Sequence, residues 1–264
     1  MAGAGIIELD EVCRTFDGGR TFAVDHVTLS VPEGAFVCLV GSSGSGKTTS
    51  LKTINRLVEP DAGEVRVEGR PVRDLAAPEL RRRIGYVFQG IGLFPHLSVG
   101  ENIGVTPDLL GWPEPEIQAR TAELLDLVGL PREWASRAPA ALSGGQQQRV
   151  GVARAIAARP RIVLMDEPFG ALDPVTRDGL GQAYRALHEQ FGLTTVMVTH
   201  DVQEAVLLAD RIVVMKGGKV LADDTPRALL AGDADPDVAG LMDMPRRQAE
   251  RVRALMGGGA SHGG

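Results

Sequence analysis

The stretch FVCLVGSSGSGKTT, residues 36–49, decides the fold that we expect for this chain. Its apolar first part, residues 36–40, predicts a short buried strand, and a helix is expected to run from the end of the Gly/Ser-rich loop to about Leu57. The loop fits the pattern GxxxxGK(S/T), in which glycines let successive backbone N–H groups turn toward an anion at a helix N-terminus. We therefore predict that nucleotide phosphates are cradled by Gly41, Ser42, Ser43, Gly44, Ser45 and Gly46.

Three side chains that follow the loop have separate expected roles at these phosphates. Lys47 is expected to neutralise the β- and γ-phosphates, and Thr48 offers a hydroxyl to Mg²⁺. Thr49 is expected to reach the α-phosphate. The alternative is a Gly/Ser-rich loop without a ligand, and the flanking strand and helix argue against it. The predicted cofactors are therefore ATP and Mg²⁺.

A second candidate motif is the apolar run IVLM, residues 162–165, which leads into Asp166 and Glu167. Such a run predicts a central strand with two carboxylates at its C-terminal edge, where open α/β sheets bind ligands. We expect Asp166 to hold Mg²⁺ through water, and Glu167 to orient and polarise the attacking water. Two surface acids after a strand are the alternative.

A third motif, LSGGQ at residues 142–146, is expected to open a helix. Its serine and glycines form a further anion-binding helix N-terminus, which is one more than a single nucleotide needs. The economical explanation is a dimer in which this segment caps the γ-phosphate bound by the partner. A serine N-cap followed by a turn is the alternative reading. The residues concerned are Ser143, Gly144, Gly145 and Gln146.

Composition narrows the possible partners and compartments. The net charge is −6, and no basic stripe suggests a polyanion surface, so we expect no nucleic-acid partner. The two cysteines form no CxxC pair, which argues against a disulfide framework and a cysteine zinc site. The N-terminal residues show no signal-peptide pattern, and no stretch approaches the ~20 apolar residues of a spanning helix. Work at a membrane would therefore require a partner.

The remaining pattern alternates strands with helices, which predicts an α/β fold with a mostly parallel sheet. Residues 90–141 are interrupted by prolines and predict a helical insertion, whose clearest helix is 114–128. Two short helices are expected after the last hairpin. Strands are predicted at 6–12, 22–31, 64–68, 84–88 and 194–199, helices at 146–158, 174–190 and 201–208, and a hairpin at 211–215 and 219–221.

With these motifs in order, the chain resembles the ATP-binding subunits of ABC transporters, for which LSGGQ is the distinguishing motif. The resemblance covers about residues 5–245. It implies an ABC-type ATPase with a RecA-like core, an N-terminal antiparallel β part and a helical subdomain at about 90–158. It also implies that two copies close head to tail around two ATP molecules.

The resemblance also implies roles for four further residues. Phe16 stands where the family stacks an aromatic ring on adenine, although tyrosine is commoner there, and a core phenylalanine is the alternative. Gln89 matches the glutamine that contacts Mg²⁺ and the attacking water, with an exposed strand-end glutamine as the alternative. Asp173, after residues 171–172, matches the loop at the dimer seam or is simply a helix N-cap. His200 matches the γ-phosphate histidine, and a structural histidine is the alternative.

Three segments resemble importers of osmoprotectants such as glycine betaine, choline and carnitine. These segments are residues 90–102, 109–113 and 245–250. The resemblance implies that the helical subdomain docks a membrane permease, that an extracytoplasmic solute-binding protein supplies the solute, and that the subunit is peripheral at the cytoplasmic face of the inner membrane. Another solute, an exporter, a soluble ABC-type ATPase and a nucleotide sensor are the alternatives.

The segment after the ATPase is expected to be short. Residues 246–264 are predicted to form a C-terminal helix and a disordered Gly-rich tail. The paired regulatory domain of many osmoprotectant ATPases does not fit into this length, so we do not expect ionic-strength sensing through it.

Overall fold

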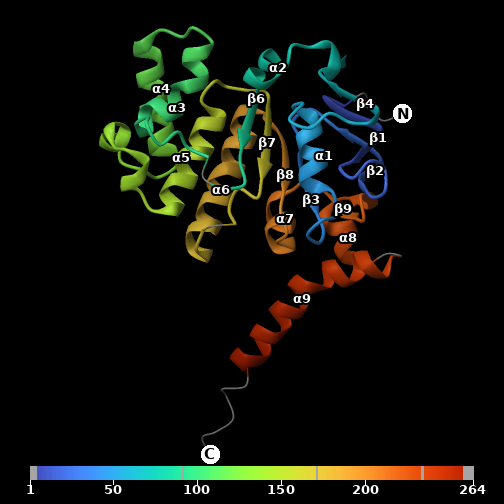
Figure 1. The fold of residues 1–264 in the computed structure, drawn as a ribbon. Coiled ribbons are helices and arrows are strands. Elements are labelled where there is room, and N and C mark those ends of the chain that lie inside the picture. Colours follow the sequence, from blue (N-terminus) through green and yellow to red (C-terminus); the bar gives the residue numbers. More distant parts are fainter. Residues whose placement is uncertain (1–4, 91, 171, 233–234, 258–264) are drawn as a thin grey trace, which may run out of the picture.

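The computed structural model describes residues 5–90, 92–170, 172–232 and 235–257. The tail predicted to be disordered falls largely on residues 258–264, which lie outside the described residues. The chain folds into two sheets with helices between and around them, and the sequence-based fold class is confirmed (Figure 1). No helix along the described ranges combines the length and apolarity of a membrane span.

The N-terminal part forms an antiparallel sheet in the order β2-β1-β4-β5. Irregular register between β1 and β2 marks bulges, which sharpen the twist of this sheet. The antiparallel β part expected from the resemblance is therefore present. Its strands are β1 (Ile7–Thr15), β2 (Phe22–Val31), β4 (Ala62–Val67) and β5 (Arg70–Pro71).

The second sheet forms the centre of the fold, in the order β10-β9-β3-β8-β7-β6. It is parallel from β9 to β6, and β10 pairs antiparallel at one edge. Every residue of β3, β7 and β8 is buried, which explains their continuous apolar runs. The strands are β3 (Phe36–Val40), β6 (Ile84–Val87), β7 (Ile162–Asp166), β8 (Thr194–Val198), β9 (Arg211–Lys216) and β10 (Lys219–Asp224).

Alternate residues of β3 divide between two hydrophobic clusters, one on each face of the central sheet. Val37 and Leu39 pack with the antiparallel sheet and with α1 (Lys47–Ile54). Phe36 and Cys38 pack with helices on the opposite face. Figure 1 shows α3, α4 and α5 grouped beyond the β6 edge of that sheet. The helices after α1 are α2 (Ala77–Arg83), α3 (Val99–Leu109), α4 (Glu114–Leu127), α5 (Gly144–Ile156), α6 (Pro174–Phe191) and α7 (Val202–Leu208), and the 3₁₀ turns are η1 (Val72–Asp74), η2 (Arg132–Ser136) and η3 (Pro139–Ala141).

The end of the chain differs from the expectation of two short helices. The first helix, α8 (Pro226–Ala231), is short, but α9 (Pro236–Gly257) has 22 residues. Val238 and Met242 anchor its first part in the core, and its later part leaves the body of the molecule (Figure 1). The helix continues through Pro245, so the expectation that both helices would be short was wrong for the second one. The domain bounds 5–245 and 246–264 stay predictions, and α9 crosses the boundary between them.

Candidate nucleotide-binding site

The predicted phosphate loop joins β3 to α1 and is closely confined by other strands. Gly46 has φ +99°, and a Cβ at this position would lie 2.3 Å from the carbonyl oxygen of Ala23 in β2. A Cβ on Gly41 would lie 2.1 Å from the carbonyl oxygen of Met215 in β9. Only glycine fits where two backbones approach this closely.

The Lys47 ammonium group lies inside the loop that precedes it. Its Nζ donates to the carbonyl oxygens of Gly41 at 2.8 Å and Ser42 at 2.9 Å. Burial lowers the pKa of Lys47, while the negative charges of Glu167 and Asp166 raise it. The amine is thus held in the concave side of the loop, where it could exchange carbonyl partners for phosphate oxygens.

A possible Mg²⁺ site lies where α1 meets the end of β7. The hydroxyl Oγ1 of Thr48 donates to Oδ1 of Asp166 at 2.7 Å, and Asp166 is only 1% exposed. The Lys52 ammonium group lies 3.7 Å from the other carboxylate oxygen. The hydroxyl of Thr48, the carboxylate of Asp166 and the amide oxygen of Gln89 are hard oxygen donors, which fit Mg²⁺. The residues that the sequence nominated for the metal are therefore compatible with it.

Three nominated catalytic side chains meet at Glu167. Oε2 of Glu167 accepts a hydrogen bond from Nε2 of Gln89 at 3.3 Å, and Oε1 lies 3.4 Å from Nδ1 of His200. The backbone of Glu167 has φ +47°, an unusual value for a residue with a Cβ, and its N–H donates to Val198 in the neighbouring strand β8. Such strain is common at functional sites. With this backbone conformation, the carboxylate of Glu167 lies against the side chains of Gln89 and His200.

These groups surround one open cavity of about 650 Å³. The ring of Phe16, 64% exposed, lies at this cavity, with the Arg14 guanidinium 4.8 Å from the ring centroid. The alternative of a core phenylalanine is therefore wrong. Ala23 in β2 also lines the cavity, and no sequence motif pointed to it. The full lining is Phe16, Ala23, Ser43, Gly44, Ser45, Gly46, Lys47, Thr48, Thr49, Gln89, Glu167 and His200.

The LSGGQ segment lies at the start of α5 and does not line this cavity. Ser143 caps the helix: its Oγ accepts from the N–H of Gln146 at 3.4 Å, and Oε1 of Gln146 accepts from the N–H of Ser143 at 2.9 Å. Gly144 and Gly145 form the first turn. In the single chain, Ser143 therefore acts as a helix N-cap, as the alternative reading expected. The segment does not reach the nucleotide cavity of its own chain.

Asp173 also acts as a helix cap. Its Oδ1 accepts from the N–H of Thr176 at 3.0 Å. Hydrogen bonding by the side chain and then by the backbone of Thr176 lowers the pKa of the exposed Asp173 carboxyl group. It does not line the cavity. A Cβ on Gly145 would lie 3.1 Å from the side chain of Leu172, so the segment before Asp173 lies against the start of α5. Residue 171 of this loop lies outside the described residues.

Comparison with known proteins agrees with this geometry. The model of the family described as "ABC transporter" matches residues 24–170. The choline transport ATP-binding protein OpuBA of Bacillus subtilis is 50% identical over 257 residues, which cover 95% of this chain and 67% of that protein. The glycine betaine uptake system ATP-binding protein YehX of Escherichia coli is 50% identical over 87% of this chain and 74% of its own. The chain thus spans about two thirds to three quarters of the length of these relatives.

Solved structures show the same architecture. A dimeric structure of MJ0796, a bacterial ABC transporter cassette, matches with a TM-score of 0.77 and 38% identity, covering 83% of this chain and 98% of that one. A dimeric post-hydrolysis state of the ATP-binding cassette MJ0796, bound to ADP and Pi, matches with a TM-score of 0.77 and 37% identity over the same shares. The chain belongs to the ABC transporter family and is an ATP hydrolase of that family.

Proposed function

We propose that this chain hydrolyses MgATP as a head-to-tail dimer and thereby powers an importer for quaternary ammonium osmolytes. The observation that carries the hydrolytic part is the position of Glu167, whose carboxylate contacts Gln89 and His200 at the cavity beside the phosphate loop. A carboxylate held in this way can take the proton of an attacking water. The relatives' printed names support the transport part.

The chemistry assigned to the site is mainly positioning and charge stabilisation, because phosphoryl transfer leaves little covalent work for the protein. Loop N–H groups and Lys47 bind the phosphates, and Mg²⁺, when bound, supplies charge that neutralises the β- and γ-phosphate oxygens. Thr48, Gln89 and Asp166 would hold the metal, Asp166 through water. Gln89 and His200 orient the carboxylate of Glu167, and His200 also faces the γ-phosphate.

The proposed dimer is supported by a helix N-terminus that could bind phosphate and does not line the cavity of its own chain. The helix N-terminus at Ser143 presents N–H groups suited to a phosphate, yet it does not line its own chain's cavity. We assign Ser143, Gly144, Gly145 and Gln146 to the ATP bound by the partner copy, and Asp173 to the seam between the copies. The dimeric MJ0796 structures support an assembly of two copies.

Replacement of Ser143 by arginine tests this assembly. Ser143→Arg should abolish ATP hydrolysis and leave the first binding of a fluorescent ATP analogue intact, because bulk at residue 143 obstructs only closure. Ser98 offers a matched control, since it caps α3 through an equivalent pair of hydrogen bonds with Glu101. Ser98→Arg should lose its cap to a similar extent and retain hydrolysis. Loss of nucleotide binding in Ser143→Arg alone would place residue 143 in its own chain's site.

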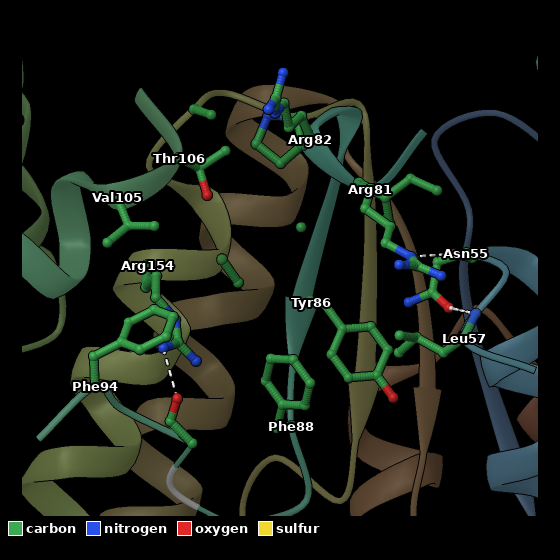
Figure 2. Close-up of a pocket in the computed structure, with 16 residues that line it drawn as sticks. Asn55, Leu57, Arg81, Arg82, Tyr86, Phe88, Phe94, Val105, Thr106 and Arg154 are labelled. Carbon is green, nitrogen blue, oxygen red and sulfur yellow. Dashed lines mark hydrogen bonds between the residues drawn. The ribbon is translucent and has the colours of Figure 1, made fainter. Parts of the chain in front are cut away.

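A groove between β6 and the α3–α5 group is the surface that we assign to the permease. It encloses about 360 Å³, and Figure 2 shows aromatic side chains along its wall. Phe88 and Phe94 are each 43% exposed there. Arg154 donates to the carbonyl oxygen of Gly92 at 2.7 Å, and its guanidinium lies 5.8 Å from both ring centroids. This groove adjoins Gln89, so an occupant would lie close to the hydrolytic site.

Cross-linking tests the docking assignment. Both native cysteines are buried, so an introduced cysteine can be addressed selectively. Thr106→Cys, within the groove, should cross-link to a cysteine in a cytoplasmic loop of the permease, and Asp178→Cys on α6 should not. Absence of a cross-link at residue 106 in every nucleotide state would contradict docking in this groove. Docking there would make the subunit peripheral at the cytoplasmic membrane face.

The proposed solute is a quaternary ammonium osmolyte such as glycine betaine, choline or carnitine, delivered by an extracytoplasmic binding protein. Relatives named for osmoprotectants are 43–50% identical to this chain, and those named for sulfate/thiosulfate and Fe(3+) are 44% and 40% identical. Both relatives at 50% identity are named for osmoprotectants, one for choline and one for glycine betaine. A strain without this subunit should lose energy-dependent uptake of these radiolabelled osmolytes. Unchanged uptake of all three, with redundant importers removed, would refute the solute and leave ATP hydrolysis unaffected.

A further inference from the structure

The hydroxyl group of Tyr86 is buried and has no hydrogen-bond partner among the residues that the structure describes. Tyr86 lies in β6 directly opposite Leu164 of the parallel strand β7. Because side chains alternate along a strand, Leu164 and Asp166 point to the same face, and this is the face of Tyr86. Figure 2 shows the hydroxyl at the end of the ring that is turned away from Arg81 and Arg82. It is directed toward the carboxyl ends of the strands, where the nucleotide cavity lies.

The carboxylate of Asp166 is short of donors at the same place. A carboxylate offers about four acceptor positions. Asp166 is 1% exposed, and within the described part of the chain its carboxylate accepts one hydrogen bond, from Thr48 at 2.7 Å. The Lys52 ammonium group, at 3.7 Å, lies beyond hydrogen-bond distance. A tyrosine hydroxyl carries its proton at neutral pH, so this group can act as a hydrogen-bond donor.

We propose that the Tyr86 hydroxyl is the second hydrogen-bond donor to Asp166 when Mg²⁺ and nucleotide are bound, and that it positions this carboxylate for the metal. The inference rests on the proposed function, which assigns Asp166 to Mg²⁺. A group that ligates a metal directly or through water is held in place by hydrogen bonds to its outer oxygens, and loss of such a partner commonly weakens metal binding by about 10–100-fold. Tyr86 and Asp166 both lie on central strands, which suits precise positioning.

The chain contains only two tyrosines, and the second provides a matched control. The hydroxyl of Tyr184 lies 2.8 Å from Oγ1 of Thr195, so it has a partner, and its position in α6 is remote from Asp166. Tyr86→Phe removes a hydroxyl that is unpaired in the resting protein. Tyr184→Phe removes one that is paired.

Two measurements on the full chain separate the two residues. In Tyr86→Phe, the Mg²⁺ concentration that half-saturates binding of a fluorescent ATP analogue should rise about tenfold, with binding in EDTA unchanged. Its unfolding temperature without nucleotide should be unchanged or higher, because a buried unpaired hydroxyl is lost. Tyr184→Phe should show the reverse: a lower unfolding temperature and an unchanged Mg²⁺ requirement.

Tyrosine labelled with ¹³C at Cζ gives a readout that does not depend on turnover. Tyr184→Phe leaves a single signal, from Tyr86, which should shift when Mg²⁺ and ADP are added together and not with ADP in EDTA. A stationary Tyr86 signal, or a wild-type Mg²⁺ requirement in Tyr86→Phe, would overturn the inference. If wild-type protein itself bound the nucleotide without any effect of Mg²⁺, the assignment of Asp166 in the proposed function would fall as well.

Discussion

Replacement of Glu167 by glutamine should separate hydrolysis from nucleotide binding. Glutamine has nearly the same shape, and it can keep the contact with Gln89, whose Nε2 lies 3.3 Å from the present carboxylate. What is lost is the ability to accept a proton from the attacking water. A positioned general base contributes roughly 10²- to 10⁴-fold to rate. At about 1.4 kcal/mol for each factor of ten, the barrier should rise by about 3–5 kcal/mol.

The same substitution should have little effect on folding. The contact that it alters joins Glu167 to His200, a side chain that is 64% exposed, and such exposed contacts contribute about 0–1 kcal/mol even between full charges. The free energy of unfolding should therefore change by less than about 1 kcal/mol. The contrast between a large kinetic effect and a small stability effect distinguishes a catalytic group from a structural one.

The assay combines phosphate release with light scattering in ATP and Mg²⁺. Glu167→Gln should release phosphate at least about 100-fold more slowly and accumulate as a dimer with ATP bound, because closure no longer ends in hydrolysis. Glu189→Gln is a suitable control, since this exposed acid on α6 pairs with Arg185 far from the cavity. A Glu167→Gln protein that stays monomeric and hydrolyses ATP at the wild-type rate would refute the assigned role.

Two further predictions concern stability without nucleotide. Gly46→Ala should lower the free energy of unfolding by more than Gly44→Ala. Both residues have positive φ, which costs roughly 1–3 kcal/mol in a residue with a Cβ, but only residue 46 would also place its Cβ 2.3 Å from a backbone oxygen. Equal losses in the two variants, measured by urea unfolding, would contradict this. Burial lowers the pKa of His188 in the folded protein, so below pH ~6.5 the unfolded chain binds a proton more readily than the folded one. The free energy of unfolding should therefore fall by up to about 1.4 kcal/mol for each pH unit below that value. His188→Gln should reduce this slope in urea titrations between pH 6.5 and 5.5, and an unchanged slope would exclude His188 as its source.

The elements that sequence alone predicted best are those whose burial is uniform. The continuous apolar runs at residues 36–40 and 162–165 match fully buried strands, and glycines marked the loop where another backbone approaches. The apolar run that ends in two acids predicted Glu167 as a catalytic residue, and the family resemblance predicted Gln89 and His200. All three meet in the structure because parallel strands end at one edge of the sheet.

Features that depend on distant partners were harder to predict. Ala23 lines the cavity only because β2 passes beside the phosphate loop, and a lone alanine carries no signal. The length of α9 was missed, since only its first part packs in the core, through Val238 and Met242, and Pro245 lies inside the helix. The unpaired hydroxyl of Tyr86 could not be inferred, since it requires the register between β6 and β7.

The confinement of the phosphate loop has a consequence for how parts of this fold can be exchanged or moved. The turn between β9 and β10 bridges the two sheets, because Gly218 donates to the carbonyl oxygen of Ser45 and accepts from the N–H of Asp25 in β2. The wall near Phe16 and the phosphate loop are therefore held as one block. A chimera that swaps the antiparallel sheet between relatives must carry this turn with it. Domain motion in the ATP cycle is therefore not expected to separate this wall from the phosphate loop.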